Sequence, residues 1–236
     1  MWLSRNKLNV WGVATFHAEE SVLVAGVDSG FSVGRLQRDG RPDLAFGVRT
    51  LKPSRPPGTF PNAVQLLTLQ NGGIVAALTE ATVVSTDGRE ELTTRLWRLN
   101  QDGSTDESFA PPQISGEGVR QIAELRDGKL LLGGTFTQIN GVVRRGLARL
   151  NVDGSVDEKF DPGIWFQSAD QQVLQFALQP DHRILVLSKL FGEHLILFRI
   201  WGDQIPWLRQ DEILGGDSPA ETPARCSSPC APEPAT

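Results

Sequence analysis

The stretch Arg149-Leu-Asn-Val-Asp153-Gly154-Ser-Val-Asp157-Glu-Lys-Phe160 decides the fold, because the chain contains it three times. The earlier copies are Arg35-Leu-Gln-Arg-Asp39-Gly40-Arg-Pro-Asp43-Leu-Ala-Phe46 and Arg98-Leu-Asn-Gln-Asp102-Gly103-Ser-Thr-Asp106-Glu-Ser-Phe109. Arg, Leu, Asp, Gly, Asp and Phe keep their places in all three copies, and the last two copies agree at nine of twelve positions. Such regular recurrence predicts a repeat protein in which each copy closes one structural unit.

A second phrase precedes each copy and is clearest at residues 119–136, which read VRQIAELRDGKLLLGGTF. Its relatives begin at Val64 and Val173, with a weaker one at Val13, which makes four units of the second phrase. The first phrase starts at 35, 98 and 149, so its spacings are 63 and 51 residues (98 − 35 and 149 − 98). Residues 199–203 resemble the start of a decayed fourth copy. The pattern predicts units of about 50 residues.

Each unit has the pattern of β-strands, with short apolar runs, tight turns and no sustained period of 3.6 residues. Asp127-Gly128 stands between two apolar runs, and Asn71-Gly72 fills the same place one unit earlier. Gly accepts a positive φ freely and Asp or Asn accepts it better than most residues, so we expect primed hairpin turns at both places.

The run Lys129-Leu-Leu-Leu-Gly133 is apolar at consecutive positions, as is typical of a strand covered on both faces. Small antiparallel sheets stacked face to face provide that environment. Because radial stacking of such sheets forms a β-propeller, we expect an all-β fold, a propeller of about four blades or a partial propeller. A β-sandwich is the alternative, but it does not explain a repeated phrase.

The chain resembles the delta-60 repeat family of bacterial propeller-like proteins over residues of about 10 to 200. The resemblance rests on the hairpin Asp127–Phe136, on Asn140-Gly-Val-Val-Arg144, and on the phrase at residues 149–160. It implies a β-propeller in an exported or surface-exposed bacterial protein. It implies no settled activity and no catalytic residues.

Two departures from the repeat bear on closure. Unit two is longer, with four prolines between residues 53 and 61, and unit four has Asp181-His182 where an Asp-Gly turn would stand. Four units are also few for a propeller, which typically has four to eight blades. The chain either closes as a small ring or forms part of a larger one with open strand edges, through which it could self-associate.

Composition excludes some classes of partner. The formal net charge is −5, so the chain lacks the basic surface that backbone-driven nucleic-acid binding needs. No stretch approaches the roughly 20 apolar residues of a membrane-spanning helix. The first eleven residues contain no apolar core typical of a secretory signal. We expect the signal for a secreted or cell-surface location, which the resemblance implies, either to lie upstream of this start or to be absent.

The expected domain boundary lies near residue 212. Residues 1–212 carry the repeat pattern, whereas residues 213–236 are rich in Pro, Ser and Ala and are expected to be disordered. The two cysteines, Cys226 and Cys230, lie in this tail without a nearby His, so free thiols are a better interpretation than zinc ligands. The repeat domain contains no cysteine and needs none at this size.

Acidic residues of the phrase are candidates for calcium binding, because Asn151-x-Asp153-Gly154 and Asn100-x-Asp102-Gly103 resemble the start of calcium-binding loops. The candidate ligands are Asp102, Asp106, Asp153 and Asp157. Calcium requires six to eight oxygen ligands, and the later bidentate Glu of such loops is absent from its place. Repetition once per unit favours a structural turn, in which Asp oxygens accept bonds from nearby backbone N–H groups. We expect no other cofactor.

Aromatic and variable loop residues are the candidates for ligand binding. Trp165 and Phe166 lie in the connection after Phe160, where an aromatic pair could meet a sugar or peptide, or could pack on the neighbouring unit. The loops that differ between units are 52–61, 113–118 and 163–170. Trp97 directly precedes the second copy of the closing phrase, at residues 98–109, and is expected to pack between units.

Three hypotheses for function remain open. The favoured one is a non-enzymatic module that offers a binding or scaffolding surface to a protein or glycan, by analogy with other propellers. The second is a propeller hydrolase or lyase acting on a carbohydrate or peptide, which would gather groups such as Glu117, Asp170 and His182 in one cavity. The other histidines, His17 and His194, have no motif around them. The third is a structural spacer in a larger assembly, with an exposed strand edge.

Overall fold

The computed structural model describes residues 15–16, 21–27, 30–52, 59–83, 90–163, 166, 171–190 and 194–201. The described residues form fourteen β-strands and no α-helix. The first two units contain β1 (Thr15–Phe16), β2 (Val22–Val27), β3 (Phe31–Leu36), β4 (Val48–Lys52), β5 (Thr59–Thr68), β6 (Ile74–Val83) and β7 (Glu90–Leu99). The last two contain β8 (Ile114–Glu124), β9 (Leu130–Ile139), β10 (Val142–Val143), β11 (Leu147–Leu150), β12 (Gln172–Leu178), β13 (Arg183–Leu190) and β14 (His194–Trp201). The expectation of an all-β chain is confirmed.

Each unit is built on three antiparallel strands in chain order. These are β1-β2-β3, β5-β6-β7, β8-β9-β11 and β12-β13-β14. The strand β4 extends the first sheet beyond β3, and β10 pairs with the far end of β9. The second and third units form one seven-stranded sheet, because the start of β8 pairs with β7 at Thr93 and Thr94 before it turns into the third unit.

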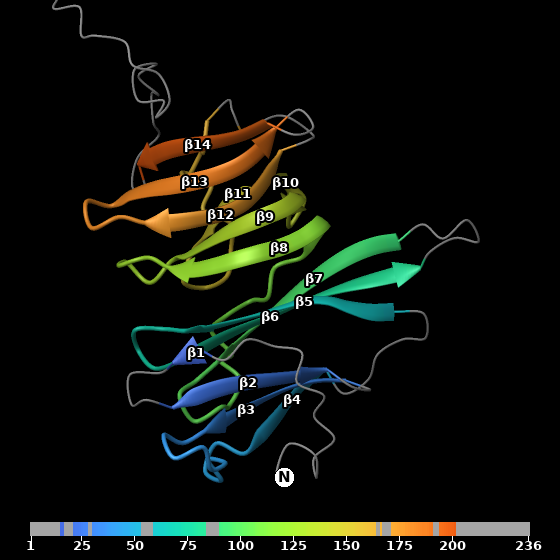
Figure 1. Ribbon diagram of the computed structural model, residues 1–236, viewed down its shortest axis with the longest axis vertical. Helices are drawn as coiled ribbons and strands as arrows, with labels where there is room; N and C mark the ends of the chain where they lie inside the picture. Colours follow the sequence, from blue (N-terminus) through green and yellow to red (C-terminus); the bar gives the residue numbers. More distant parts are fainter. Residues whose placement is uncertain are drawn as a thin grey trace, which may run out of the picture.

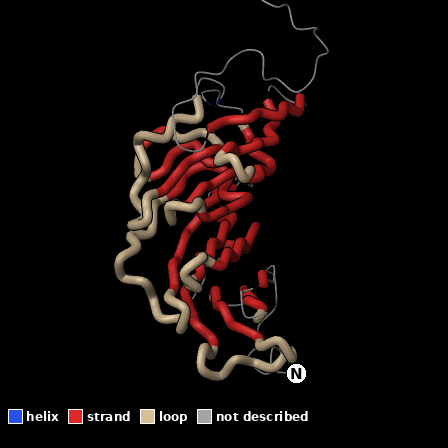
Figure 2. The backbone as a smooth tube through the Cα atoms, turned by 90° about the vertical axis from the view of Figure 1, so that its left-hand side faces the viewer, coloured by secondary structure: helices blue, strands red, loops and turns tan. Residues whose placement is uncertain are grey.

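The units follow one another in a curved row (Figure 1), and the curvature is visible from the side in Figure 2. Each unit packs on the next, and the first strand of unit three, β8, contacts both β5 of unit two and β12 of unit four. The first and last units lie at opposite ends of the row in both views. Among the described strands, β1 pairs with β2 and β14 with β13, so these strands do not join the two ends into a ring.

The hydrophobic core consists of three layers, one between each pair of successive units. Side chains of β9 point alternately to its two faces and so contribute to two of these layers. Leu130 and Leu132 pack toward the second unit, whereas Leu131 packs toward the fourth. All three side chains are at most 1% exposed. The prediction that this strand is covered on both faces is therefore confirmed. In the layer between the first two units, Trp97 packs against Phe31 with the ring centroids 5.3 Å apart, as expected for a residue between units.

In units two and three, the turn between the first two strands is described and differs from the predicted primed hairpin. Gly128 has φ +78° and Gly72 has φ +83°, but no positive φ occurs at Asp127 or Asn71. The N–H of Gly128 donates to the carbonyl of Leu125 at 3.0 Å, which makes a three-residue loop with a type I turn followed by a left-handed Gly. The prediction of a primed turn was wrong because this loop needs a positive φ at one residue only.

Unit four keeps the same turn without a glycine. His182 has φ 67° and donates its N–H to the carbonyl of Gln179 at 3.1 Å, as Gly128 does to Leu125. A left-handed conformation costs a residue with a side chain about 1–2 kcal/mol. The change from Gly to His in the sequence therefore altered the residue but not the hairpin.

Candidate functional site

The repeated phrase folds into the same three-part contact in each copy. The Nε of Arg149 donates to Oδ2 of Asp157 at 2.8 Å, and the guanidinium lies 4.8 Å from the ring centroid of Phe160. The matching ion-pair distances are 2.8 Å for Arg35–Asp43 and 2.7 Å for Arg98–Asp106. Phe46, Phe109 and Phe160 are all at most 5% exposed. We call this set of three side chains the Arg-Asp-Phe clamp.

The clamp also ties one unit to the next. The Nη1 of Arg35 donates to the carbonyl of Gln101 at 3.0 Å, and Nη1 of Arg98 donates to the carbonyl of Val152. In both cases the acceptor lies in the phrase of the following unit. Planar guanidinium groups suit this geometry, since one face covers the Phe ring while separate N–H groups reach the carboxylate and the carbonyl.

The calcium candidates are the acidic members of these turns. Oδ1 of Asp153 accepts the N–H and the hydroxyl of Ser155 at 2.9 and 2.6 Å, and Asp102 does the same with Ser104. These bonds from serine, the hydroxyl first, hold the pKa of both carboxyls below the ordinary value. Within the described ranges, no three His, Cys, Asp or Glu side chains gather closely enough to hold a metal ion.

Asp157 is the most enclosed of the four candidates, with its side chain 5% exposed. Its Oδ2 accepts from Nε of Arg149 and from Nζ of Lys129, each at 2.8 Å. Burial by itself would raise the pKa of Asp157, but the bonds and charges of Lys129 and Arg149 outweigh it and lower the pKa below 3.8. Asp106 likewise has a lowered pKa, because the Ser108 hydroxyl and Arg98 bond to its carboxylate. Two cationic side chains bond to the same oxygen of the Asp157 carboxylate, which favours the structural-turn interpretation of this residue.

The aromatic pair predicted as a ligand loop lies partly within the described chain. Phe166 is 4% exposed and its ring centroid is 5.6 Å from that of Phe198 in the layer between units three and four. Its position supports the packing alternative for that residue. Trp165 lies outside the described residues, as do His17 and Asp170.

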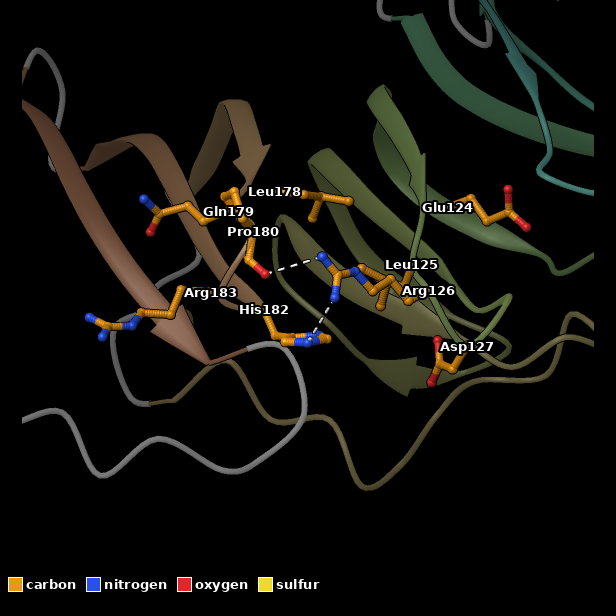
Figure 3. A pocket seen from close by; sticks show the side chains of 9 residues that line it. All are labelled: Glu124, Leu125, Arg126, Asp127, Leu178, Gln179, Pro180, His182 and Arg183. Atoms are coloured by element: carbon orange, nitrogen blue, oxygen red, sulfur yellow. Dashed lines mark hydrogen bonds between the residues drawn. The ribbon is translucent and has the colours of Figure 1, made fainter. Parts of the chain in front are cut away.

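The groups that an enzyme would have to gather are separated. His182 occupies the hairpin turn of unit four, whereas Glu117 lies near the start of β8, between Gly116 and Gly118. Of the two, only His182 lines the cavity drawn in Figure 3. Glu117 lies near the start of β8, whereas His182 contacts Arg126, just beyond the other end of that strand, so the structure does not bring these two side chains together.

Among the described residues, surface grooves offer candidate binding sites, and we consider three of them. The first, the seam groove, has a volume of about 400 Å³ and lies between the hairpin turns of units three and four (Figure 3). The guanidinium of Arg126 crosses it and bonds to the carbonyl of Pro180 and to Nε2 of His182, both at 3.2 Å. Gln70 makes the same kind of link one unit earlier, to the carbonyl of Leu125 at 3.3 Å. Because the same link recurs between two pairs of successive units, we interpret the contacts across the seam groove as structural contacts between units.

The second, the fork groove, opens where β8 separates from β7 and has a volume of about 520 Å³. β7 pairs with β8 only at Thr93 and Thr94, and its end bonds to the repeated phrase through Arg98 and Leu99, so residues 91–92 and 95–97 of β7 border the groove. It is lined by residues 91–97 and 111–115, which include Arg95, Trp97 and the proline pair Pro111-Pro112. Gln113, Ile114 and Ser115 supply part of this lining. The prediction of a variable loop over 113–118 was wrong, because every residue of it after Gln113 belongs to β8, whose start pairs with β7 and β9.

The third, the loop groove, has a volume of about 460 Å³ and lies beside the connection after Phe160. Arg144 and Arg145 line one part of it and Glu158 and Asp161 another, so its surface is mainly charged. Gly163 and Phe166, at the start of the variable loop 163–170, complete it. Two of the three segments predicted to vary between units, 113–118 and 163–170, thus contribute residues to these grooves.

Sequence reasoning missed the contacts between units. Gln121 of β8 donates its Nε2 to the carbonyl of Phe176 at 2.8 Å and accepts the N–H of Phe176 at 2.7 Å. This side chain therefore pairs with the backbone of β12 as a neighbouring strand would. A lone glutamine in a strand does not indicate this role in the sequence. The contact depends on how β12 of the next unit is placed against β8.

Comparison with known proteins supports the fold. The family model described as "Domain of unknown function (DUF5122) beta-propeller" matches residues 85–109 and 125–160. The fold is of the β-propeller class. The matched residues contain the second and third copies of the phrase and the hairpin of unit three, on which the resemblance to a propeller repeat family rested.

A solved structure of a protein of unknown function from Bacteroides caccae is also similar. It has 13% sequence identity, covers 77% of this chain and 74% of its own, and superposes with a TM-score of 0.31. No curated protein matches. Among the described residues, no helix is long and apolar enough to cross a membrane.

Proposed function

We propose that this chain is a non-enzymatic propeller repeat module that binds an extended peptide segment of a partner protein in the fork groove. The observation that carries the proposal is that the repeated residues hold the fold together, whereas residues that vary between units border a groove. The repeated Arg, Asp and Phe side chains are engaged in the clamps, whereas residues 113–115, at the variable start of β8, border an open groove beside a strand edge.

The fork groove suits an extended peptide for two reasons. The edge of β7 that borders it can accept a further strand through backbone hydrogen bonds, which is a common way to bind peptides. Its lining combines aromatic and proline surface at Trp97 and Pro111-Pro112 with the charges of Glu91 and Arg95, so side chains of the peptide would meet both apolar and charged partners.

The test is selection of peptides from a random display library on the full chain. We expect selected peptides to bind at least about tenfold more weakly to Arg95→Glu, a loss of about 1.4 kcal/mol. Arg41→Glu is the matched control, because Arg41 is 82% exposed on its side chain and lies in the first unit, away from the groove. Equal loss in both variants, or no peptide retained by the wild-type chain, would reject the proposed site.

The glycan and enzyme alternatives have their own measurements. A carbohydrate array probed with the same three proteins distinguishes a glycan ligand from a peptide. For the hydrolase alternative, a panel of chromogenic glycosides and labelled casein is incubated with wild type and His182→Ala. We expect no turnover that depends on His182, since Glu117 lies near the start of β8 and His182 contacts Arg126 beyond its other end.

A further inference from the structure

The outer face of the last sheet is equivalent to faces that are covered in the three preceding units. Equivalent positions in the four units are identified by the residue that pairs across the sheet with the first Arg of the phrase. In unit four, Arg199 takes the place of that Arg. The partners of these arginines are Leu23, Val75, Leu131 and Leu185 in units one to four. Two residues before each Arg, the pairs are Val33–Ala25, Leu96–Ala77, Leu147–Gly133 and Leu197–Leu187.

These positions receive the following unit wherever one is present. In the first three units the side chains at these places are at most 2% exposed. Gly133 shows how close the approach is, since an added Cβ would lie 2.7 Å from the ring of Phe176 in unit four. On the last sheet the same face is open to the surface, with Leu197 37%, Leu195 62% and Trp201 46% exposed. We call residues 185, 187, 195, 197 and 201 the terminal face.

The terminal face is apolar with a basic rim. Arg183, Lys189 and Arg199 pair across the sheet with Trp201, Leu195 and Leu185, so their side chains point to the same side. Arg183 is ion-paired with Asp181 at 3.1 Å and stacks on Trp201 at 4.7 Å. The Nε of Arg199 is buried without a hydrogen-bond partner among the described residues. An occupant with apolar and acidic side chains matches this surface.

The size of the face argues for a tethered occupant. Strands of seven or eight residues span about 26 Å, and three strands span about 14 Å, so the face offers roughly 400 Å². A stable interface between separate proteins buries about 800 Å² on each partner. A segment joined to the sheet needs much less area, because its effective concentration reaches the millimolar range.

We propose that residues 203–212 of this same chain bind the terminal face. In each earlier unit, the residues that cover this face follow the third strand in the chain: Val64 and Leu66, then Ile122, then Val173 and Phe176. After β14 the chain continues at once with residues 203–212, DQIPWLRQDE, which contain Ile205, Trp207 and Leu208 and three acidic side chains against one basic. The inference concerns a contact separate from the peptide groove and does not depend on it.

Thiol labelling of the full chain tests this contact. In a Cys226→Ser/Cys230→Ser background, a reporter cysteine at Leu197 is labelled with a disulfide reagent, with and without Trp207→Asp/Leu208→Asp. We expect the Asp pair to increase the labelling rate at position 197 about tenfold, which corresponds to about 1.4 kcal/mol of binding. A reporter at Leu44, which is 82% exposed in the first unit, is the control and should not change.

Two results would overturn the proposal. One is a rate at position 197 that is the same with and without the Asp pair. The other is slow labelling that disappears on dilution, together with twice the monomer mass in sedimentation, which would assign the face to a second copy. If the reporter variant fails to fold, hydrogen exchange of β14 decides: Trp207→Asp/Leu208→Asp should accelerate it relative to wild type, and unchanged exchange refutes the contact.

Discussion

Replacing Asp157 by Asn tests whether the Arg-Asp-Phe clamp holds the repeat together. The variant keeps the size of the side chain and the oxygen that accepts the N–H of Lys159 at 3.0 Å. It removes the negative charge that Arg149 and Lys129 both contact at 2.8 Å. The two cations would then face a neutral amide whose N–H₂ group cannot accept their hydrogens, in a place where Arg149 and Asp157 are each 5% exposed.

The expected loss is large because the pair is buried. Removing one partner of a buried ion pair typically costs about 3–5 kcal/mol. Since Lys129 remains 27% exposed and can turn toward water, we expect the low end, about 3 kcal/mol. For a domain of about 200 residues this lowers the melting temperature by about 6–12 °C. Differential scanning calorimetry, or thermal unfolding followed by tryptophan fluorescence, measures the change.

Asp153→Asn is the matched control. It lies four residues earlier in the same phrase, and its Oδ1 accepts bonds from Ser155 only, which an Asn oxygen can also accept. Exposed turn positions of this kind usually change stability by less than about 0.5 kcal/mol. If the two variants melt within about 2 °C of each other, a difference of less than about 1 kcal/mol, the clamp is not a major source of stability.

Four further predictions follow from the same contacts. Asp43, Asp106 and Asp157 have pKa values lowered from 3.8, so their contribution to stability is present above pH 3.8 and is lost as pH falls through the lower folded-state values. The melting temperature, measured as a function of pH, should therefore fall in that acidic range, and it should fall less in Asp157→Asn. Gly154→Ala should lower the free energy of unfolding by well over the ~1–2 kcal/mol that a left-handed alanine costs, because its Cβ would lie 2.3 Å from the carbonyl oxygen of Ala110. Gly40→Ala has open space around it and should cost only that amount; urea unfolding measures both variants. Gln121→Ala should lower stability by about 2–3 kcal/mol, because the backbone groups of Phe176 lose both partners, and hydrogen exchange at Phe176 should rise; unchanged exchange would contradict the contact between units. Calcium at 1 mM should leave the melting temperature unchanged relative to chelator, whereas a rise that increases with calcium concentration would revive the Asp153 site.

Much of the scaffold could be predicted because its information is local and repeated. The Arg, Asp and Phe of the phrase lie within twelve residues, and the same hydrogen bonds form in each copy. The hairpin turns were correctly located at Asn71-Gly72 and Asp127-Gly128, but their type was wrong. Loop length, which sequence leaves ambiguous by one residue, decides between a primed turn and a type I turn with a left-handed Gly.

The candidate site was less predictable, because grooves form between segments that are distant in the chain. The fork groove depends on where β8 leaves β7, and that point follows from pairing at Thr93 and Thr94 rather than from any motif. Phe166 was a ligand candidate from its position in a loop, yet it packs against Phe198, some thirty residues later. The sequence does not distinguish an aromatic residue that faces a ligand from one that packs in the core, because the difference depends on the position of the neighbouring unit.

The sequence by itself determined the unit: its strands, its closing phrase and the double-sided burial of β9 follow from local spacing and side-chain chemistry. Only the tertiary structure decided how the units meet. The link from Gln121 to Phe176, the joining of two units through β8, and the uncovered face of β14 all depend on residues in different units coming together. Strand alternation fixes which side chains share a face, but the packing of one sheet on another decides which face is buried.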